Sequence, residues 1–398
     1  MEGIIVFYFP FFSAKKYFTD EDRKHLNKTK SWPFIDSSFN DFFINIFLNN
    51  SEIKSIPEEL ISSDFFNYQD ELSNCLFTFE TKLKYRDYKY LNIIKCGLHF
   101  QNLNITEIHS SSFWGSKNLL EIIDKLDIPE FFNKSSQIKE QLFIQKLKTQ
   151  IVLIDKNVLS LTDRKYSLLD LALDKNSGTA KKTIENIEFQ ERSHSKSYLE
   201  SLLNNSIIDQ YQEWTTIITQ KKIITVYNFV SKDKEGNLLN NSVQFGLIYI
   251  NKIIVSELLT SLNLWINENK FENNLELSKY YMRFSRNFDF KLISTKNLYN
   301  EYSNLLVVNL KINDEKEIIN MKIKEIENIL EKEKNQLTNL LLFSIAIIQL
   351  ITAFIDDLRN GLASFFNLNK GIIGHYISIF FIAICLFLVL YFMKKRKI

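Results

Sequence analysis

The sequence is poor in the residue types on which many catalytic and metal-binding sites are built. It contains three cysteines, nine glycines, four prolines and five histidines in 398 residues. Three scattered cysteines exclude a disulfide framework and a tetrahedral zinc site, and they suit a reducing cytosol. A glycine-rich phosphate loop and the HExxH and GxSxG motifs are missing as well. The sequence therefore gives no support to an enzyme and indicates no certain cofactor.

Charge of either sign is not in excess. The chain has 49 basic and 47 acidic residues, which gives a net charge of +2. Because these charges are spread along the whole length, we expect no direct binding to DNA or RNA. With 45% hydrophobic and 24% charged residues, the composition is typical of a chain with a large folded, globular part.

Two long runs near the C-terminus carry no charge. Residues 337–355 read LTNLLLFSIAIIQLITAFI, and as a helix they cover about 28 Å, close to the thickness of the hydrocarbon layer. Residues 372–393 form a second run of this kind. The pattern predicts a hairpin of two transmembrane helices, joined by an outer loop over 356–371, in a lipid membrane. The alternative interpretation is a buried pair of amphipathic helices.

The basic tail at 394–398 orients this hairpin. Residues 394–397 read Lys-Lys-Arg-Lys, and basic residues that flank a span remain on the cytoplasmic side. We therefore expect a multi-pass protein of the inner (plasma) membrane with both termini in the cytoplasm.

The segment 313–336 is predicted to be a long stalk helix. It is rich in Glu, Lys and Ile and has no Pro or Gly. Its apolar residues follow alternating steps of four and three, interrupted by Glu333, which indicates one packing seam: Ile319, Ile323, Ile326, Leu330 and Leu337. We expect the stalk to continue unbroken into the first span, forming a rod of about 60 Å. Two separate helices that meet near the bilayer are the alternative.

A polar stripe follows one face of this rod. Its members are spaced by three and four residues: Asn335, Thr338, Leu342, Ile345, Gln349, Thr352 and Asp356. The amide of Gln349 needs a partner in hydrocarbon, either another helix or the water of a pore. A ring of Asp356 carboxylates at the mouth would favour a pore for cations. Since two helices cannot enclose a conduit, a channel requires a homo-oligomer.

This order of parts resembles the CorA family of divalent-cation channels. A large N-terminal cytosolic domain, a long helix running into the first span, a short outer loop, a second span and a basic tail, MKKRKI, are the shared features. The resemblance covers about residues 313–398 and lies in topology more than in letters. It implies a pentameric funnel with the first span lining the pore, and a divalent cation such as Mg²⁺ as the candidate ion.

The Gly-Met-Asn signature of that family is absent. The corresponding positions read Phe354-Ile355-Asp356-Asp357-Leu358, with Asn360-Gly361 following, so magnesium selectivity does not carry over. Asp357 and Asn360 are candidate outer-mouth residues without a motif match. Divergent CorA-like proteins also serve as effectors in prokaryotic antiviral defence, including CRISPR-associated systems. That resemblance implies a small nucleotide second messenger acting on the cytosolic domain.

The region before the stalk is predicted to be an α/β (α+β) cytosolic domain in two portions, 1–173 and 198–312, with a flexible connection at 174–197. Strands are expected at 4–12, 76–86, 91–100 and 150–155, and helices at 121–126 and 137–148. Residues 222–230 and 243–250, with a polar turn at 234–237 between them, are expected to form a hairpin. Helical pattern resumes at 253–267.

Two basic groups are candidate ligand-binding sites. Lys82, Lys84 and Arg86 alternate along a predicted strand, so they share one face and could hold a phosphate-bearing ligand, although an exposed face explains them equally well. A second group interleaves cations with rings that could stack a base: Lys279, Arg283, Arg286 and Lys291, with Tyr280, Tyr281, Phe284 and Phe288. A solvated helix face over an aromatic core, or contact with anionic lipid, is the alternative.

The function that these patterns favour is a homo-oligomeric CorA-like ion channel or transporter, for cations, gated by its cytosolic sensor domain. The alternative is a membrane-anchored binding or effector module whose hairpin conducts nothing.

Overall fold

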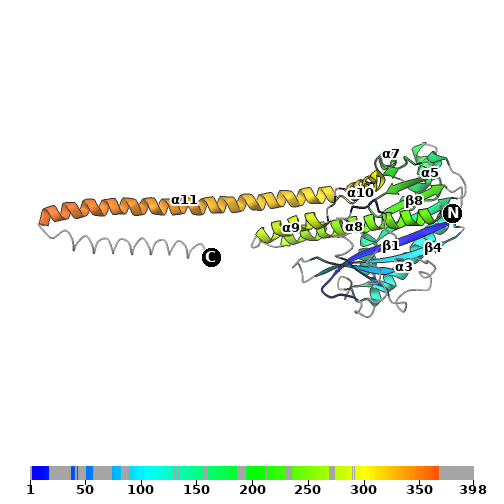
Figure 1. Cartoon of the computed structure of the whole chain (residues 1–398), viewed down its shortest axis with the longest axis horizontal. Helices are drawn as coiled ribbons and strands as arrows, with labels where there is room; N and C mark the ends of the chain where they lie inside the picture. Colours follow the sequence, from blue (N-terminus) through cyan, green and yellow to red (C-terminus); the bar gives the residue numbers. More distant parts are fainter. Residues whose placement is uncertain are drawn as a thin grey trace. The chain divides into compact units, whose positions relative to one another are not determined.

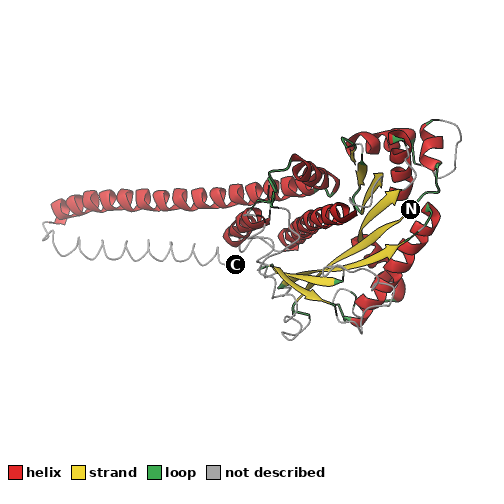
Figure 2. Cartoon of the chain, turned by 45° about the vertical axis from the view of Figure 1, so that its right-hand side comes forward, coloured by secondary structure: helices red, strands yellow, loops and turns green. Residues whose placement is uncertain are grey.

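The computed structural model describes residues 2–17, 37–40, 43, 51–56, 74–81, 89–101, 103–128, 131, 134–155, 160–185, 194–211, 213–228, 235–268, 274–288, 290 and 292–366. The chain divides into two compact units, Met1–Asn320 and Met321–Ile398. The first unit contains a mixed sheet with helices on both faces (Figures 1 and 2). The expected α/β class of the N-terminal region is confirmed.

The sheet has eight strands in the order β2-β3-β4-β1-β5-β8-β7-β6. Strand β1 (Glu2–Ser13) lies near the centre and pairs antiparallel with β4 (Tyr90–Phe100) and β5 (Lys148–Asp155). Strand β5 in turn pairs in parallel with β8 (Lys222–Asn228). The flanking strands are β2 (Ser51–Ser55), β3 (Cys75–Glu80), β6 (Ile207–Ile208) and β7 (Trp214–Ile218).

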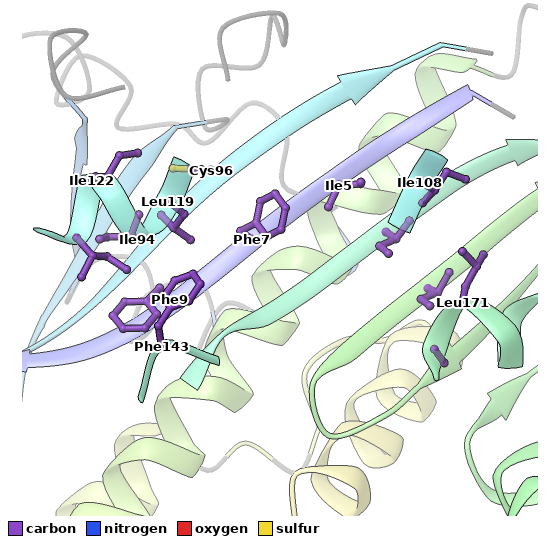
Figure 3. Close-up of a cluster of buried hydrophobic side chains, with 14 of the residues drawn as sticks. Ile5, Phe7, Phe9, Ile94, Cys96, Ile108, Leu119, Ile122, Phe143 and Leu171 are labelled. Carbon is purple, nitrogen blue, oxygen red and sulfur yellow. The ribbon is translucent and has the colours of Figure 1, made fainter. Parts of the chain in front are cut away.

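One face of the sheet is apolar because every second residue of β1 from Ile5 to Phe11 places an apolar side chain on that face. Ile5, Phe7, Phe9 and Phe11 point to the same side and are fully buried. They pack against α3 (Ile105–Lys125) and α4 (Ser136–Lys146), as Figure 3 shows for Ile108, Leu119, Ile122 and Phe143. The same core includes α5 (Leu161–Ala172), followed by α6 (Thr179–Ile184) and α7 (Lys196–Asn205).

Helix α3 begins where it does because Asn104 caps it. The side chain of Asn104 accepts a hydrogen bond from the Glu107 backbone N–H (2.9 Å), and the Glu107 carboxylate accepts one from the Asn104 N–H (2.7 Å). This reciprocal capping box satisfies two backbone donors that a helix start leaves free.

The other face of the sheet is partly polar. Tyr8 donates a hydrogen bond to Gln150 Oε1 (2.7 Å), and its ring meets Tyr249 of α8 (Glu235–Glu268) edge-on at 5.3 Å. Tyr302 lies on α10 (Asn297–Asn309), and burial together with the neighbouring phenols of Tyr8 and Tyr249 raises its pKa well above the ordinary value. Helix α9 (Asn274–Phe288) follows α8. Among the described residues, the buried hydroxyls of Tyr227 and Tyr302 have no hydrogen-bond partner.

Helix α11 runs without a break from Ile312 to Phe366, which is 55 residues or about 80 Å. The expected continuity of the stalk with residues 337–355 is therefore confirmed (Figure 1). The helix also continues through 356–366, where the sequence was expected to form a loop. This stretch reads DDLRNGLASFF and has no proline, so little in it opposes a helix.

Residues 243–250 were expected to be a strand, and this prediction is wrong. They belong to α8, whose residues from Phe245 to Val255 are buried all round the helix. A helix covered on every side shows a continuous apolar run, and such a run has no period by which a strand could be told apart. The helix also begins at Glu235, where a turn was expected.

The remaining strands and helices agree with expectation in place, apart from their ends. Strand β3 stops at Glu80, and residues 82–86 of the expected strand lie outside the described part of the chain. The stretch 174–197 contains α6 and the start of α7. Strand β5 precedes this stretch and β8 follows it, yet the two pair directly, so one sheet joins the two portions expected on either side.

Gly115 allows α3 to lie close to the sheet. A Cβ atom there would come within 2.5 Å of Leu98 Cδ1 and 2.6 Å of Phe7 Cε2. Because Phe7 is fully buried and cannot move aside, we expect Gly115→Ala to lower the free energy of unfolding by about 1–3 kcal/mol despite the better helix propensity of alanine. Denaturant unfolding followed by circular dichroism measures this. Ser111→Ala, one turn earlier on α3, is the control, and equal stability of the two variants would contradict the packing argument.

Candidate functional site: the apolar segment of α11 and its polar stripe

The second half of α11 exposes a large apolar surface. None of the most apolar stretch within Ile312–Phe354 is buried. Its exposed side chains include Leu341 (58%), Phe343 (65%) and Leu350 (73%). Isolated exposed apolar residues are ordinary, but a contiguous set on one helix indicates a surface that is covered by lipid or by another protein surface.

The polar stripe lies on this helix as the spacing predicts. Asn335, Thr338, Leu342, Ile345, Gln349 and Thr352 all belong to α11, and all six side chains are exposed. On an α-helix, steps of three and four keep residues on one side, with a drift of about 20° for every seven residues. The stripe is therefore a gently spiralling face of the helix, with polar groups at both ends and at Gln349.

The hydroxyl groups of this segment are satisfied by the helix itself. Thr338 donates to the Lys334 carbonyl (2.9 Å), Ser344 to Leu340 (2.8 Å) and Thr352 to Ile348 (2.7 Å). Such bonds let Ser and Thr face an apolar medium at small cost. An amide has two donors and an acceptor, so Gln349 is the group in this stripe whose polarity most requires an external partner.

Several expected site residues cannot be placed in the same way. Asp356, Asp357 and Asn360 lie within α11, but their side chains are outside the described part. Lys82, Lys84 and Arg86 fall outside it entirely, as do the expected second span and the basic tail.

Another helix has the length and composition of a span. Residues Val243–Asn267 of α8 pass the same test of length and composition, but 83% of their most apolar stretch is buried within the first unit. This segment is a core helix, packed between the sheet and α10. The corresponding stretch of α11 differs, because none of it is buried.

In the second basic group, the three described cations are exposed, whereas two of the aromatic rings are used in contacts within the protein. Lys279, Arg283 and Arg286 are exposed on α9. Phe284 is buried, and Tyr280 donates a hydrogen bond to the Thr81 carbonyl (3.1 Å) while burial raises its pKa. These two rings are therefore not available to stack on a base. Lys291 lies outside the described residues.

A cluster of charged side chains that the sequence did not reveal joins α3, β8 and the end of α5. Asp174, in the left-handed conformation, accepts from His109 Nδ1 (3.2 Å) and pairs with Lys222. Burial opposes ionisation, but the hydrogen bond from His109 and the charge of Lys222 outweigh it and lower the pKa of Asp174. Asp170 accepts from the backbone of Gly178 (2.6 Å) and Ala180 (2.8 Å). The contacts are long-range in sequence, so spacing could not predict them.

This cluster links three elements of the first unit, and among the described residues its contacts are those of a structural ion-pair group. No nucleophilic side chain contacts His109 in the described residues, where its second ring nitrogen lies 3.2 Å from the Lys175 carbonyl oxygen. Among the residues that the structure describes, no group of three or more His, Cys, Asp or Glu side chains could hold a metal ion.

Comparisons with known proteins give little further guidance. No protein-family model matches the chain, and no solved structure matches it. A stretch of 112 residues is 33% identical to human ubiquitin carboxyl-terminal hydrolase 29. The match covers 27% of this chain and 12% of that protein, so it does not show a shared family.

The lowered pKa of Asp174 has a definite consequence for stability. Its carboxylate contributes fully above the unfolded pKa of about 3.9, and the contribution is lost as the pH falls through the lower folded value. We expect Asp174→Asn to lower the free energy of unfolding by about 0.2–1 kcal/mol at pH 7, and by less below about pH 4. Asparagine tolerates the left-handed backbone, so the substitution adds little strain.

Urea unfolding of both proteins from pH 7 to pH 3 measures this difference. Lys222→Gln provides the control, since removing the cation should shrink the effect of Asp174→Asn. A difference between wild type and variant that stays constant over the whole pH range would contradict the assignment.

Proposed function

We propose that this chain is a homo-oligomeric membrane channel or transporter for cations, in which α11 crosses the bilayer and its polar stripe lines the pore. The observation that carries the proposal is the combination, on one unbroken helix, of an unburied uncharged segment with a polar face that includes Gln349. A helix satisfies all its own backbone groups, which is the condition for crossing lipid.

The polar face argues for several copies around an axis. In lipid the Gln349 amide needs water or another helix, and one helix pair cannot surround water. A closed ring of identical subunits places every copy of Gln349 at the same height and can bring the six described stripe residues to a common centre. By the resemblance to CorA proteins, such a ring is a pentamer.

The remaining parts of the proposal follow the sequence. Residues 372–393 form the second span, and the basic tail at 394–397 keeps both termini in the cytoplasm, which is the arrangement of a multi-pass inner-membrane protein. Asp356, Asp357 and Asn360 then lie toward the outer mouth, where carboxylates concentrate cations. Since the Gly-Met-Asn signature is absent, we do not propose selectivity for magnesium.

Gating by the first unit is supported by the continuity of α11. The helix begins at Ile312, inside the first unit, where Ile312 and Ile319 are fully buried and Asn263 of α8 donates to Glu315 (3.0 Å). A rearrangement of α8 or α10 therefore acts directly on the start of the same helix that continues into the apolar segment. A nucleotide messenger, as in the defence effectors that the chain resembles, is one signal of this kind.

Membrane insertion is tested by placing a charge at the centre of the segment. Arginine at a span centre costs about 2.5–3.5 kcal/mol, so we expect Ala346→Arg to move much of the chain out of the carbonate-resistant membrane fraction. Met321→Arg, on an exposed position near the start of the second unit, should leave it there. Release of the wild-type chain by carbonate would contradict the crossing.

Conduction is tested by moving the amide to another face of α11. In liposomes, we expect Gln349→Leu to slow cation efflux by about tenfold or more. The variant loses one hydrogen bond to a passing ion or its water, and a loss of ~1.4 kcal/mol corresponds to a tenfold change in rate. The double variant Gln349→Leu with Ile347→Gln keeps the composition but turns the amide through about 160°, and should not restore the rate.

The outcomes separate the two candidate functions. Absence of efflux from wild-type liposomes, or equal efflux from wild type and Gln349→Leu, would overturn the pore. It would favour a membrane-anchored binding or effector module. The bonds of Thr338, Ser344 and Thr352 to their own helix favour that alternative, since they suit a face that meets only lipid.

A further inference from the structure

Three neighbouring strands end or begin at one edge of the sheet, and backbone hydrogen bonds tie their ends together. Strand β1 ends at Ser13, β3 at Glu80, and β4 begins at Tyr90. Lys89 N–H donates to the Ser13 carbonyl (3.0 Å), and Thr81 N–H donates to the Lys89 carbonyl (2.9 Å). The Lys89 backbone is therefore fixed between the other two strands, and its side chain is exposed.

Two more lysines follow β1 at the same edge. Lys15 and Lys16 are both exposed, and the backbone of Lys15 is held by a hydrogen bond from Ser13 Oγ (2.7 Å). The Lys15 ammonium lies 5.4 Å from the centre of the Tyr17 ring, and that of Lys16 lies 5.6 Å from the centre of Tyr90. Contacts of this kind hold the two cations against aromatic surfaces without neutralising them.

Helix α9 brings the second basic group to this edge. The hydrogen bond from Tyr280 to the Thr81 carbonyl joins residues 199 positions apart and places α9 beside Thr81, whose N–H donates to the Lys89 carbonyl. Lys279 and Arg283 flank Tyr280 on the helix and are exposed. Lys279 and Arg283 are four positions apart on the helix, so both cations lie on the same face.

The balance of charge on this surface is positive. In the part of the chain that the structure describes, Lys15, Lys89, Lys279 and Arg283 form no ion pair, and Lys16 pairs with Glu52 at 2.5 Å. Among the described residues, the carboxylates near it are those of Glu52, Glu80 at the end of β3, and Asp127; burial together with the charge of Asp127 raises the pKa of Tyr17 to about 12. The cations come from three separate parts of the chain, which the hydrogen bonds between Lys89, Ser13, Thr81 and Tyr280 bring together, so they do not form a stripe along a single helix.

We propose that this basic edge, made of Lys15, Lys16, Lys89, Lys279 and Arg283, binds a soluble anion that carries two or more phosphate groups. Ammonium and guanidinium groups form short, charge-assisted hydrogen bonds to phosphate oxygens, and Arg283 can do so with two bonds at once. Several cations around one site match an anion with several charges better than a single phosphate. The binding goes beyond the proposed function, because it stands whether or not α11 conducts ions.

The test uses the full chain in nanodiscs of neutral phosphatidylcholine and inorganic triphosphate as the probe, titrated calorimetrically without divalent metal. We expect saturable binding that weakens as salt is raised, and at least tenfold weaker binding by the double variant Lys89→Ala with Arg283→Ala. Lys125→Ala, which removes an exposed lysine of α3, is the matched control and should bind as the wild type does. Unfolding of each variant, followed by circular dichroism, checks that the fold is kept.

Three results would overturn the proposal. The first is no binding of triphosphate by the folded wild-type chain, and the second is equal loss of binding in Lys125→Ala. The third is that the chain binds vesicles that contain phosphatidylglycerol and does not bind triphosphate, and that the double variant abolishes the vesicle binding. That result would assign the surface to a lipid headgroup. Ion flux enters none of these measurements, so a failure here is distinct from a failure of the channel.

Discussion

The removal of residues 337–355 from water is the constraint on which the rest of the interpretation depends. Burial of apolar surface contributes about 25 cal/mol per Å², so an apolar helix left in water forgoes a large part of its stabilisation. Helix α8 meets this requirement inside the first unit, where the sheet and α10 cover it. The apolar part of α11 finds no such cover among the residues that the structure describes.

The two faces of the sheet differ in the side chains that they bury. The face toward α3 to α5 is filled by phenylalanine, leucine and isoleucine, whereas the face toward α8 and α10 includes Tyr8, Gln150 and Tyr227. A buried hydroxyl without a partner costs about 1–3 kcal/mol, and Tyr227 and Tyr302 both lie in this layer. Helix α10 leads into α11 through Lys311, which has a left-handed backbone.

The sequence predicted those parts of the fold in which a local pattern decides the outcome. The apolar run of β1 and the uninterrupted helix-forming composition of α11 are of this kind, and both were placed correctly. Residues 243–250 were predicted wrongly as a strand because burial on all sides of the helix removes the periodic signal. The helix lies so close to the sheet that a Cβ atom at Gly246 would come within 2.9 Å of the Tyr8 hydroxyl. The polar stripe needed only helical spacing. The meeting of α9 with Thr81 needed contacts between distant residues, which no spacing rule contains.

The geometry of the stripe also restricts how copies of α11 can assemble. From Asn335 to Asp356 the stripe follows a repeat of seven residues, which falls short of two full turns of a straight helix, and the face turns by about 60° over that length. Straight parallel helices would therefore present Gln349 to the axis only by turning Asn335 or Asp356 away from it. A left-handed supercoil removes this drift, because it brings the helix to 3.5 residues per turn relative to the bundle axis. A pore lined along the whole stripe thus requires left-handed packing of α11, and any change in that supercoil rotates the ends of the stripe with respect to Gln349.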